Sequence, residues 1–252
     1  MKAHIASVLF LIFLPLYFMA QDSNRHKVYL IPGQAADYRS FQFLELDDKY
    51  EIEIIEHPLP ERNESMVSLA RRLSASIDTT RSYSFVGVSL GGMLAIEMSK
   101  YLQPEKIIII ASIKGQQEMP KRYKFLRVVP LYKLFNGGFY QWGANFLRPL
   151  FEHDSDQVDE ISRAMLEAKP RNYIKRTIHC IITWRNETIP ENLVHIHGDK
   201  DNTLPHKNIG EAITIKNGTH MMVMTSAKEV SQIINQTLAE VQLSAPSVQR
   251  EE

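Results

Sequence analysis

The sequence predicts an α/β protein built on a doubly wound, mostly parallel sheet, and three observations indicate it. Short apolar runs that end at Gly or Pro alternate with segments whose apolar residues recur at helical spacing. The run Ile107–Ile110 is apolar at every position, which is typical of a central parallel strand covered by helices on both faces. Residues 84–98 combine an apolar run, the pentapeptide GVSLG and a helix-like stretch, which indicates a strand, a sharp turn and a helix.

The expected elements alternate along the chain. Pro32 and Pro58 close the first two strands, because proline cannot donate the hydrogen bond that would continue them. Further on, Met66, Leu69 and Leu73 recur at helical spacing. On such patterns we expect strands at 27–31, 50–56, 84–88, 105–111, 193–197 and 211–215, and helices at 37–46, 64–77, 90–101 and 225–240.

Segment 115–185 interrupts this alternation. It contains no clear strand and many aromatic residues at helix-like spacing, so we expect a helical lid inserted into one α/β domain that spans 27–242. The length of 252 residues and the hydrophobic content of 44% suffice for one such domain. From Lys114 to Lys133 there are six basic residues and a single acidic one, Glu118. Two interpretations stay open: a solvated basic face over an aromatic core, or a lid that shapes an apolar pocket and favours acidic groups or a membrane surface.

The two ends of the chain differ from its middle. Lys2 precedes an apolar run at 5–19 that ends before Ala20, and residues 1–20 in this order are typical of an export signal. The run is shorter than the roughly 20 residues that a spanning helix needs. Phe18 is unusual near a cleavage site, so removal of the signal and its retention as an anchor both stay open. We expect an exported protein, periplasmic, secreted or lumenal, or membrane-anchored if the signal is kept, with a disordered tail at 243–252.

Charge and cysteine content limit the classes of partner. Lys+Arg and Asp+Glu are equal at 29 each, and this balance disfavours nucleic acid or an acidic polymer. We expect a small-molecule substrate, no nucleic acid, no cofactor, no metal, and membrane contact only through the N-terminal segment; the oligomeric state stays open. The single cysteine, Cys180, lies in the apolar run 178–182, where a buried, inert thiol is expected.

Three short motifs carry candidate chemistry, and each follows an expected strand. GVSLG at 87–91 places Ser89 at a sharp bend, where the flanking glycines remove side chains that would collide. HGDKD at 197–201 places carboxylates at the carboxyl end of a strand, and GTH at 218–220 places His220 after the last strand. The chain order is therefore serine, acid, histidine.

In these three motifs, in this order, the chain resembles the α/β-hydrolase superfamily over about residues 27–240. The resemblance implies that Ser89 is the nucleophile, that His220 acts as base and then as acid, and that Asp201 orients the imidazole. Asp201 is favoured because it lies three residues after the loop glycine, with Asp199 as the alternative. No carboxylate follows the strand at 105–111 before Glu118, so an acid placed there is disfavoured.

An oxyanion formed by attack needs backbone amide donors. The amide of Leu90, directly after the nucleophile, is one expected donor. The resemblance implies that the second comes from the loop after the first strand, where this chain has Pro32-Gly33 in place of the usual His-Gly. Gln34 is the expected donor; Ala35, and a contribution from the side chain of Gln34, stay open.

The expected activity is hydrolysis of a carboxylic ester or thioester of a small, apolar acyl or aromatic substrate through an acyl-Ser89 intermediate. One alternative is a non-hydrolytic protein of the same fold, an acyltransferase, a lyase or a binding module. Another is a metal-dependent hydrolase, because alternation along a strand would place His195, His197 and Asp199 on one side. The remaining histidines are expected to be isolated surface or packing residues: His57, His153, His179 and His206.

Overall fold

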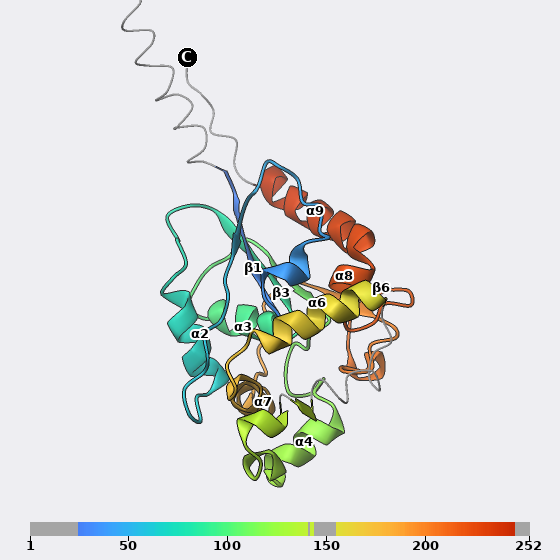
Figure 1. Ribbon diagram of the computed structural model, residues 1–252. Coiled ribbons are helices and arrows are strands. Elements are labelled where there is room, and N and C mark those ends of the chain that lie inside the picture. Colours follow the sequence, from blue (N-terminus) through green and yellow to red (C-terminus); the bar gives the residue numbers. More distant parts are fainter. Residues whose placement is uncertain (1–24, 141, 144–154, 245–252) are drawn as a thin grey trace, which may run out of the picture.

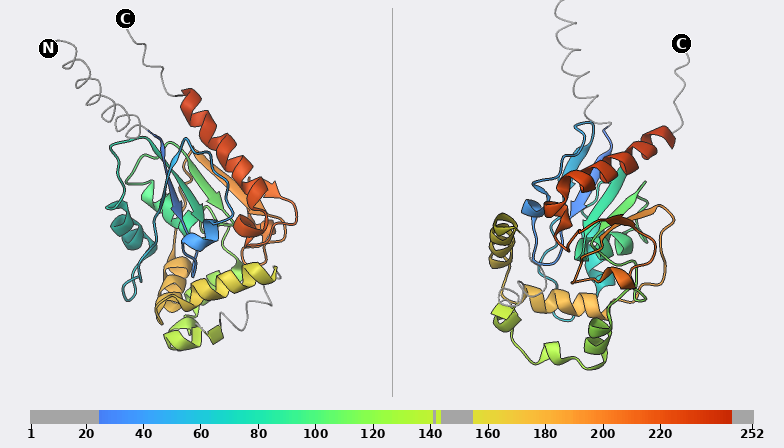
Figure 2. Two further views of the ribbon diagram at one scale, coloured as in Figure 1. Left: turned by 45° about the horizontal axis from the view of Figure 1, so that its top comes forward. Right: turned by 90° about the vertical axis from the view of Figure 1, so that its right-hand side faces the viewer.

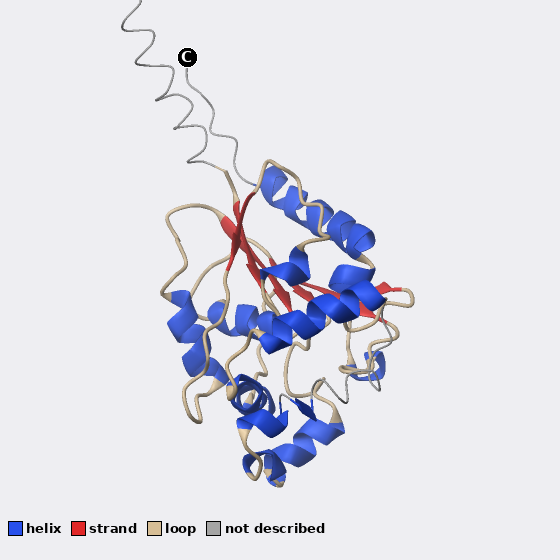
Figure 3. Cartoon of the chain, viewed as in Figure 1, coloured by secondary structure: helices blue, strands red, loops and turns tan. Residues whose placement is uncertain are grey.

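The computed structural model describes residues 25–140, 142–143 and 155–244. In this part of the chain six parallel strands form one sheet in the order β2-β1-β3-β4-β5-β6 (Figures 1 and 3). The strands are β1 (Lys27–Ile31), β2 (Glu51–Ile54), β3 (Tyr83–Val88), β4 (Ile107–Ile110), β5 (Leu193–Gly198) and β6 (Ile213–Ile215). Because all strands are parallel, their carboxyl ends meet at one edge of the sheet, and ligand sites in such folds gather there.

The sheet is covered on both faces, as the doubly wound prediction requires. Alternate residues of one strand enter different cores: Ile107 and Ile109 pack on one side, Ile108 and Ile110 on the other. Helices α2 (Met66–Ser74) and α3 (Leu90–Met98) cover the first side. The second side is covered by α6 (Asp156–Glu167), α8 (Met222–Thr225), α9 (Ala227–Ser244) and the 3₁₀ helix η1 (Tyr38–Phe41). The α/β fold class is thereby confirmed.

The described residues of the segment between β4 and β5 contain helices and no strand. It contains α4 (Lys121–Val128), the 3₁₀ helix η2 (Leu131–Lys133), α6 and α7 (Tyr173–Thr183). Figure 2 shows these helices gathered beyond the carboxyl ends of the strands. The expected aromatic core forms only in part: Tyr132 and Tyr173 are buried, but α4 contains no buried residue. Two of the aromatic residues of this segment, Phe146 and Phe151, lie outside the described residues.

The prediction of a helix at 37–46 is wrong. Only the short η1 forms, with Asp37 as its N-cap, and an irregular segment follows. The physical reason is tertiary: the amides of Glu45 and Asp47 donate to side chains of α9, those of Ser231 and Asn235, instead of to carbonyls one helical turn back. The neighbouring helix thus supplies the acceptors that a local helix would otherwise provide.

The other elements agree with expectation apart from their ends. The helix expected at 225–240 is two helices, α8 and α9, separated at Ser226. Because α9 ends at Ser244, the first two residues of the expected tail are helical; the rest of the tail and the whole expected signal at 1–20 lie outside the described residues. Within the described ranges no helix is long and apolar enough to cross a membrane.

Candidate active site

Ser89 lies at the turn between β3 and α3. Its backbone has φ 51° and ψ −114°, a left-handed conformation that is strained for a residue with a side chain. Four hydrogen bonds hold its backbone: the amide of Ser89 donates to Ile110 O (2.9 Å), and Ser89 O accepts from the amides of Gly92 (3.0 Å) and Met93 (3.2 Å) and from Ser112 Oγ (2.7 Å). The turn also needs glycine at 91, because a Cβ there would lie 2.0 Å from the carbonyl oxygen of Ile31. The elbow predicted from GVSLG is present.

The structure brings Ser89, His220 and Asp201 together. His220 Nε2 lies 3.0 Å from Ser89 Oγ, and His220 Nδ1 lies 2.8 Å from Asp201 Oδ2. Asp201 follows β5 and His220 follows β6, so two neighbouring strand ends carry them to the nucleophile. With its proton on Nδ1, which donates to the carboxylate, the imidazole keeps a lone pair on Nε2 to accept the serine hydroxyl proton.

The carboxylate of Asp201 is buried but compensated. Burial by itself would raise its pKa, but the charge of His220 and the hydrogen bond from its ring hold the pKa of Asp201 below its usual value. Asp201 Oδ1 also accepts from the amide of Leu204 (2.6 Å). Asp199, the alternative acid, is exposed, and its Oδ1 accepts from the amide of Asn217 (2.6 Å). The geometry therefore favours Asp201, and Asp199 braces the turn that follows β6.

A second pair of histidines lies behind Asp201. His197 Nε2 donates to Leu204 O (2.8 Å) and lies 3.5 Å from Asp201 Oδ2, while its Nδ1 is 3.3 Å from His195 Nε2. Burial lowers the pKa of both imidazoles, that of His195 to about 2, so both rings are neutral at pH 7. Leu204 is thus held at both ends, because its carbonyl accepts from His197 and its amide donates to the carboxylate of Asp201.

These contacts leave no geometric support for the metal-dependent alternative. His195 and His197 face each other, and Asp199 is turned to the amide of Asn217. Within the described ranges no three His, Cys, Asp or Glu side chains form a group that could hold a metal ion.

The loop after β1 lies against the nucleophile. A Cβ placed on Gly33 would be 3.4 Å from Ser89 Cβ and 3.3 Å from Val88 O, so a glycine allows this close approach. The side chain of Gln34 points to α7, where its Nε2 donates to Thr177 Oγ1 (2.6 Å). The amide of Ala35 interacts with the hydroxyl of Tyr173. This arrangement favours the amide of Gln34 over that of Ala35 as the second oxyanion donor, and it gives the side chain of Gln34 a structural contact. The oxyanion role of Gln34 and Leu90 stays a prediction.

The sequence predicted an isolated His57, but the structure shows that this residue links two segments. It is buried between the loop after β1 and α7: its Nε2 donates to Pro32 O (3.1 Å), and its Nδ1 accepts from the hydroxyl of Tyr173 (2.7 Å). The two rings stack with centroids 5.7 Å apart. Burial lowers the pKa of His57 to about 4, so the ring is neutral at pH 7. Because these partners lie 25 and 116 residues away, no local pattern signals the contact.

The remaining candidates have packing contacts. His179 Nδ1 is 2.6 Å from Tyr132 Oη, and His206 Nε2 is 3.2 Å from Thr214 Oγ1. His153 lies outside the described residues. Burial raises the pKa of the Cys180 thiol to about 12, which fits the expected inert thiol. Ser112, whose hydroxyl holds the Ser89 carbonyl, was also missed, although its place directly beyond β4 at the sheet edge was a usable signal.

Comparison with known proteins finds solved structures with a similar fold. No family model and no curated protein matches the sequence. A thermophilic esterase from Thermogutta terrifontis is 16% identical, with a TM-score of 0.61 over 86% of this chain and 91% of the esterase. MenH from S. aureus is 13% identical, with a TM-score of 0.66 over 87% and 95% of the two chains. YbtT, a type II thioesterase from the yersiniabactin pathway, is 14% identical, with a TM-score of 0.54 over 86% and 94%.

At these sequence identities the structural similarity establishes the fold but not the reaction. The strand order, the serine turn and the positions of the acid and the histidine at successive strand ends agree with it. The chain has the fold of the α/β-hydrolase superfamily.

Proposed function

We propose that this protein is a serine hydrolase that cleaves a carboxylic ester or thioester through an acyl-Ser89 intermediate. The observation that carries the proposal is the continuous hydrogen-bonded line from Ser89 Oγ through His220 to Asp201, with contacts of 3.0 and 2.8 Å. A hydroxyl, an imidazole and a buried carboxylate in this order make up the arrangement that turns serine into a nucleophile.

In the first half of the reaction Ser89 Oγ attacks the substrate carbonyl carbon, and its proton passes to His220 Nε2. The imidazolium is stabilised by Asp201, which accepts from Nδ1. The negative charge that develops on the carbonyl oxygen is met by the amides of Leu90, at the start of α3, and Gln34. When the tetrahedral species collapses, the alcohol or thiol leaves with the proton from Nε2, and Ser89 carries the acyl group.

In the second half, a water molecule gives its proton to His220 Nε2 and attacks the acyl carbon. The same amides hold the oxyanion, and collapse releases the carboxylic acid and returns the proton to Ser89 Oγ. Loss of a single oxyanion donor costs about 3 kcal/mol of transition-state stabilisation in enzymes of this kind. The hydrogen bonds that hold the loop, from Gln34 Nε2 to Thr177 and from His57 to Pro32, keep that donor in place.

Support for the substrate class comes from two sides. The similar structures include proteins described as an esterase and a thioesterase, which is consistent with a small-molecule ester or thioester as substrate. The side of the insertion that meets the loop after β1 is apolar, with Leu166, Tyr173 and Ile174 packed against Ala35, which favours an apolar acyl or aromatic group. For the N-terminal segment we keep the proposal of export, which N-terminal sequencing of the mature protein tests: a start at Met1 in a soluble cytosolic fraction contradicts it.

The decisive experiment is labelling with a fluorophosphonate, followed by mapping of the adduct by mass spectrometry. We expect the label on Ser89, no label on the Ser89→Ala variant, and normal labelling of the control Ser76→Ala, whose serine is exposed in the turn that follows α2. Absence of label from folded wild-type protein would contradict the proposal. Release of free acid from p-nitrophenyl esters and from acyl thioesters then separates hydrolysis from transfer: an acyl-Ser89 adduct that discharges only to an added alcohol or amine would indicate an acyltransferase.

A further inference from the structure

The insertion exposes a dense apolar surface. Among the described residues fifteen large hydrophobic side chains are exposed, and eight of these lie between positions 125 and 142. We call this set the insertion patch: Phe125, Val128, Val129, Leu131, Leu134, Phe135, Phe139 and Trp142. Three of its members are 80% (Val128), 75% (Leu134) and 60% (Trp142) exposed. Soluble monomers rarely leave so many neighbouring apolar side chains in water without a use for them.

Part of the patch packs on itself, since Phe135 stacks on Phe139 with ring centroids 4.3 Å apart and Trp142 lies 6.0 Å from Phe139, yet every member keeps at least 38% of its surface exposed. Helix α4 is held through Arg127, which donates to the carbonyls of Ile182 (2.5 Å) and Trp184 (2.8 Å). The segment after η2 is held through Lys175, whose ammonium donates to the carbonyls of Lys133 (3.0 Å) and Phe135 (2.6 Å). These two attachments are polar contacts to backbone, and the exposed surface of the patch side chains stays accessible to a partner.

The segment that carries the patch has charges of one sign, although Glu187 of a neighbouring segment lines a pocket with Lys124, Arg127 and Val128. Residues 119–151 contain no Asp or Glu. The ammonium groups of Lys121, Lys124 and Lys133 are exposed, and no described carboxylate pairs with them. A cavity of about 310 Å³ lies beside η2, and no carboxylate lines it. Four cationic side chains do: Arg62 and Lys133, which are exposed, and Lys175 and Arg176, which are half-buried. Apolar and cationic groups are thus interleaved on one surface.

We propose that the insertion patch docks on an anionic phospholipid surface, with the aromatic and aliphatic side chains among the acyl chains and the lysines at the phosphates. Exposed Trp and Phe beside Lys is the combination that a membrane interface favours. A second copy of this chain fits less well, because it would bring the same unpaired cations against one another. The partner is therefore one that supplies both an apolar layer and negative charge.

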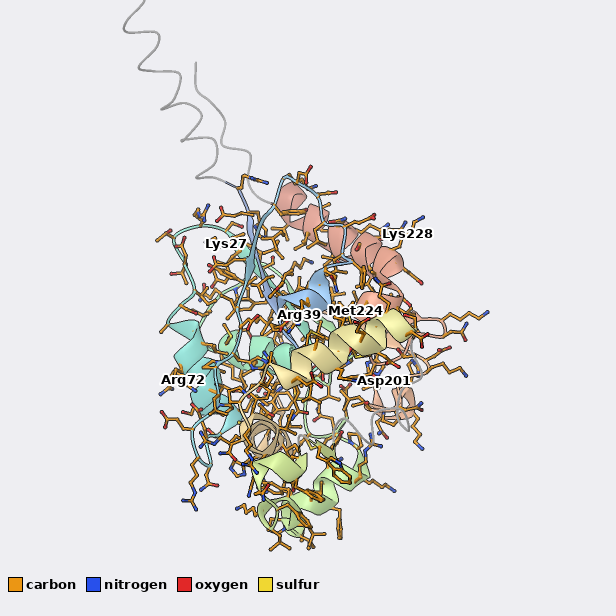
Figure 4. The ribbon with its side chains drawn as sticks, viewed as in Figure 1. Lys27, Arg39, Arg72, Asp201, Met224 and Lys228 are labelled. Atoms are coloured by element: carbon orange, nitrogen blue, oxygen red, sulfur yellow. The ribbon has the colours of Figure 1, made fainter. Side chains whose placement is uncertain are left out.

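The position of the patch gives this docking a consequence for the site. Figure 1 shows α4 at the end of the molecule beyond the carboxyl ends of the strands, far from the start of β1. Figure 4 shows the labelled Lys228, on α9, on a different side of the molecule from α4. The guanidinium of Arg122, on α4, donates to the carbonyls of Asn202 and Thr203, the two residues after Asp201. A docked insertion therefore faces the membrane together with the edge of the sheet that bears the site.

Trp142 provides a local readout in the full chain. The sequence has two tryptophans, and the other, Trp184, is buried. Vesicles of phosphatidylcholine with phosphatidylglycerol, both carrying brominated acyl chains, should quench the emission of Trp142, and the Trp142→Phe variant should lose this quenching. Each of Lys121→Gln, Lys124→Gln and Lys133→Gln should raise the lipid concentration at half-quenching about fivefold. Val128→Ser and Leu134→Ser should each raise it about tenfold.

Matched controls lie elsewhere on the surface: Lys228→Gln on α9 and Val67→Ser on α2 should leave the quenching curve unchanged. The Ser89→Ala variant should also behave as wild type, which separates this inference from the proposed chemistry. Equal quenching by vesicles of phosphatidylcholine alone, or wild-type curves for the patch variants, would overturn the inference. So would a dimer in sedimentation velocity that Val128→Ser and Leu134→Ser dissociate, because the patch would then be a self-association surface.

Discussion

The buried His57 predicts a specific loss of stability in acid. In the folded chain its pKa is lowered to about 4 by burial, whereas in the unfolded chain an exposed imidazole keeps the usual 6.5. As the pH falls below 6.5, the unfolded chain binds a proton that folded His57 does not bind. Mass action then favours the unfolded state, so the free energy of unfolding decreases from pH 6.5 to about 4 and this contribution stays constant below that.

The size of the effect follows from the pKa gap. About 2.5 pH units at about 1.36 kcal/mol per unit correspond to about 3 kcal/mol for His57 alone. His195, whose pKa is lowered to about 2, adds a second contribution of the same sign over the same window. The wild-type protein should therefore lose stability at a slope of about 1.4 kcal/mol per pH unit for each of the two residues.

Urea unfolding at a series of pH values measures this slope. In His57→Gln the amide oxygen can accept from Tyr173 and the amide nitrogen can donate to Pro32, so the contacts are kept without a titrating group. We expect the slope between pH 6.5 and about 4 to decrease by about 1.4 kcal/mol per pH unit in this variant. The control Val67→Ser changes an exposed residue of α2 that does not titrate, and it should keep the wild-type slope. An unchanged slope in folded His57→Gln would refute the reasoning.

Three further predictions concern the site and its surroundings. Asp201→Asn should lower kcat on a p-nitrophenyl ester about 10⁴-fold with KM little changed, because the imidazole loses its orienting carboxylate, whereas an equal loss in Asp199→Asn would contradict the assignment of the acid. Gly91→Ala should lower the free energy of unfolding by about 3 kcal/mol, because its Cβ would lie 2.0 Å from Ile31 O; Gly143→Ala, with open space around it, is the matched control in urea unfolding. Cys180, with its pKa raised to about 12 and its side chain buried, should resist iodoacetamide in the folded protein and react in urea, as mass spectrometry can show; rapid labelling of native protein would disprove its burial.

Local patterns were sufficient for much of the fold and for the candidate triad. The apolar runs predicted the strands to within a few residues, and β1 begins and ends where expected. The turn at Ser89 was predictable because strand, Gly-flanked serine and helix are adjacent in the chain. Once parallel strands are recognised, residues that follow β5 and β6 must lie near one edge, so the meeting of Asp201 and His220 followed from order alone.

Choices between equivalent local signals needed the tertiary structure. Asp199 and Asp201 lie in the same loop, and only the position of Asn217 against Asp199 and of His220 against Asp201 separates them. The segment expected to be a helix at 37–46 has helical spacing, but α9 supplies other acceptors for its amides. Propensity and spacing report what a segment does alone, and long-range hydrogen bonds can outweigh them.

The sequence by itself determined the fold class, the elbow and the order of serine, acid and histidine, because these depend on periodicity and on neighbours along the chain. Only the tertiary structure decided that His57 joins the loop after β1 to α7, and that Phe125, Phe139 and Trp142 are exposed. Apolar spacing shows that a side chain favours leaving water, but which surface it meets depends on segments more than a hundred residues away, whose approach no local pattern encodes.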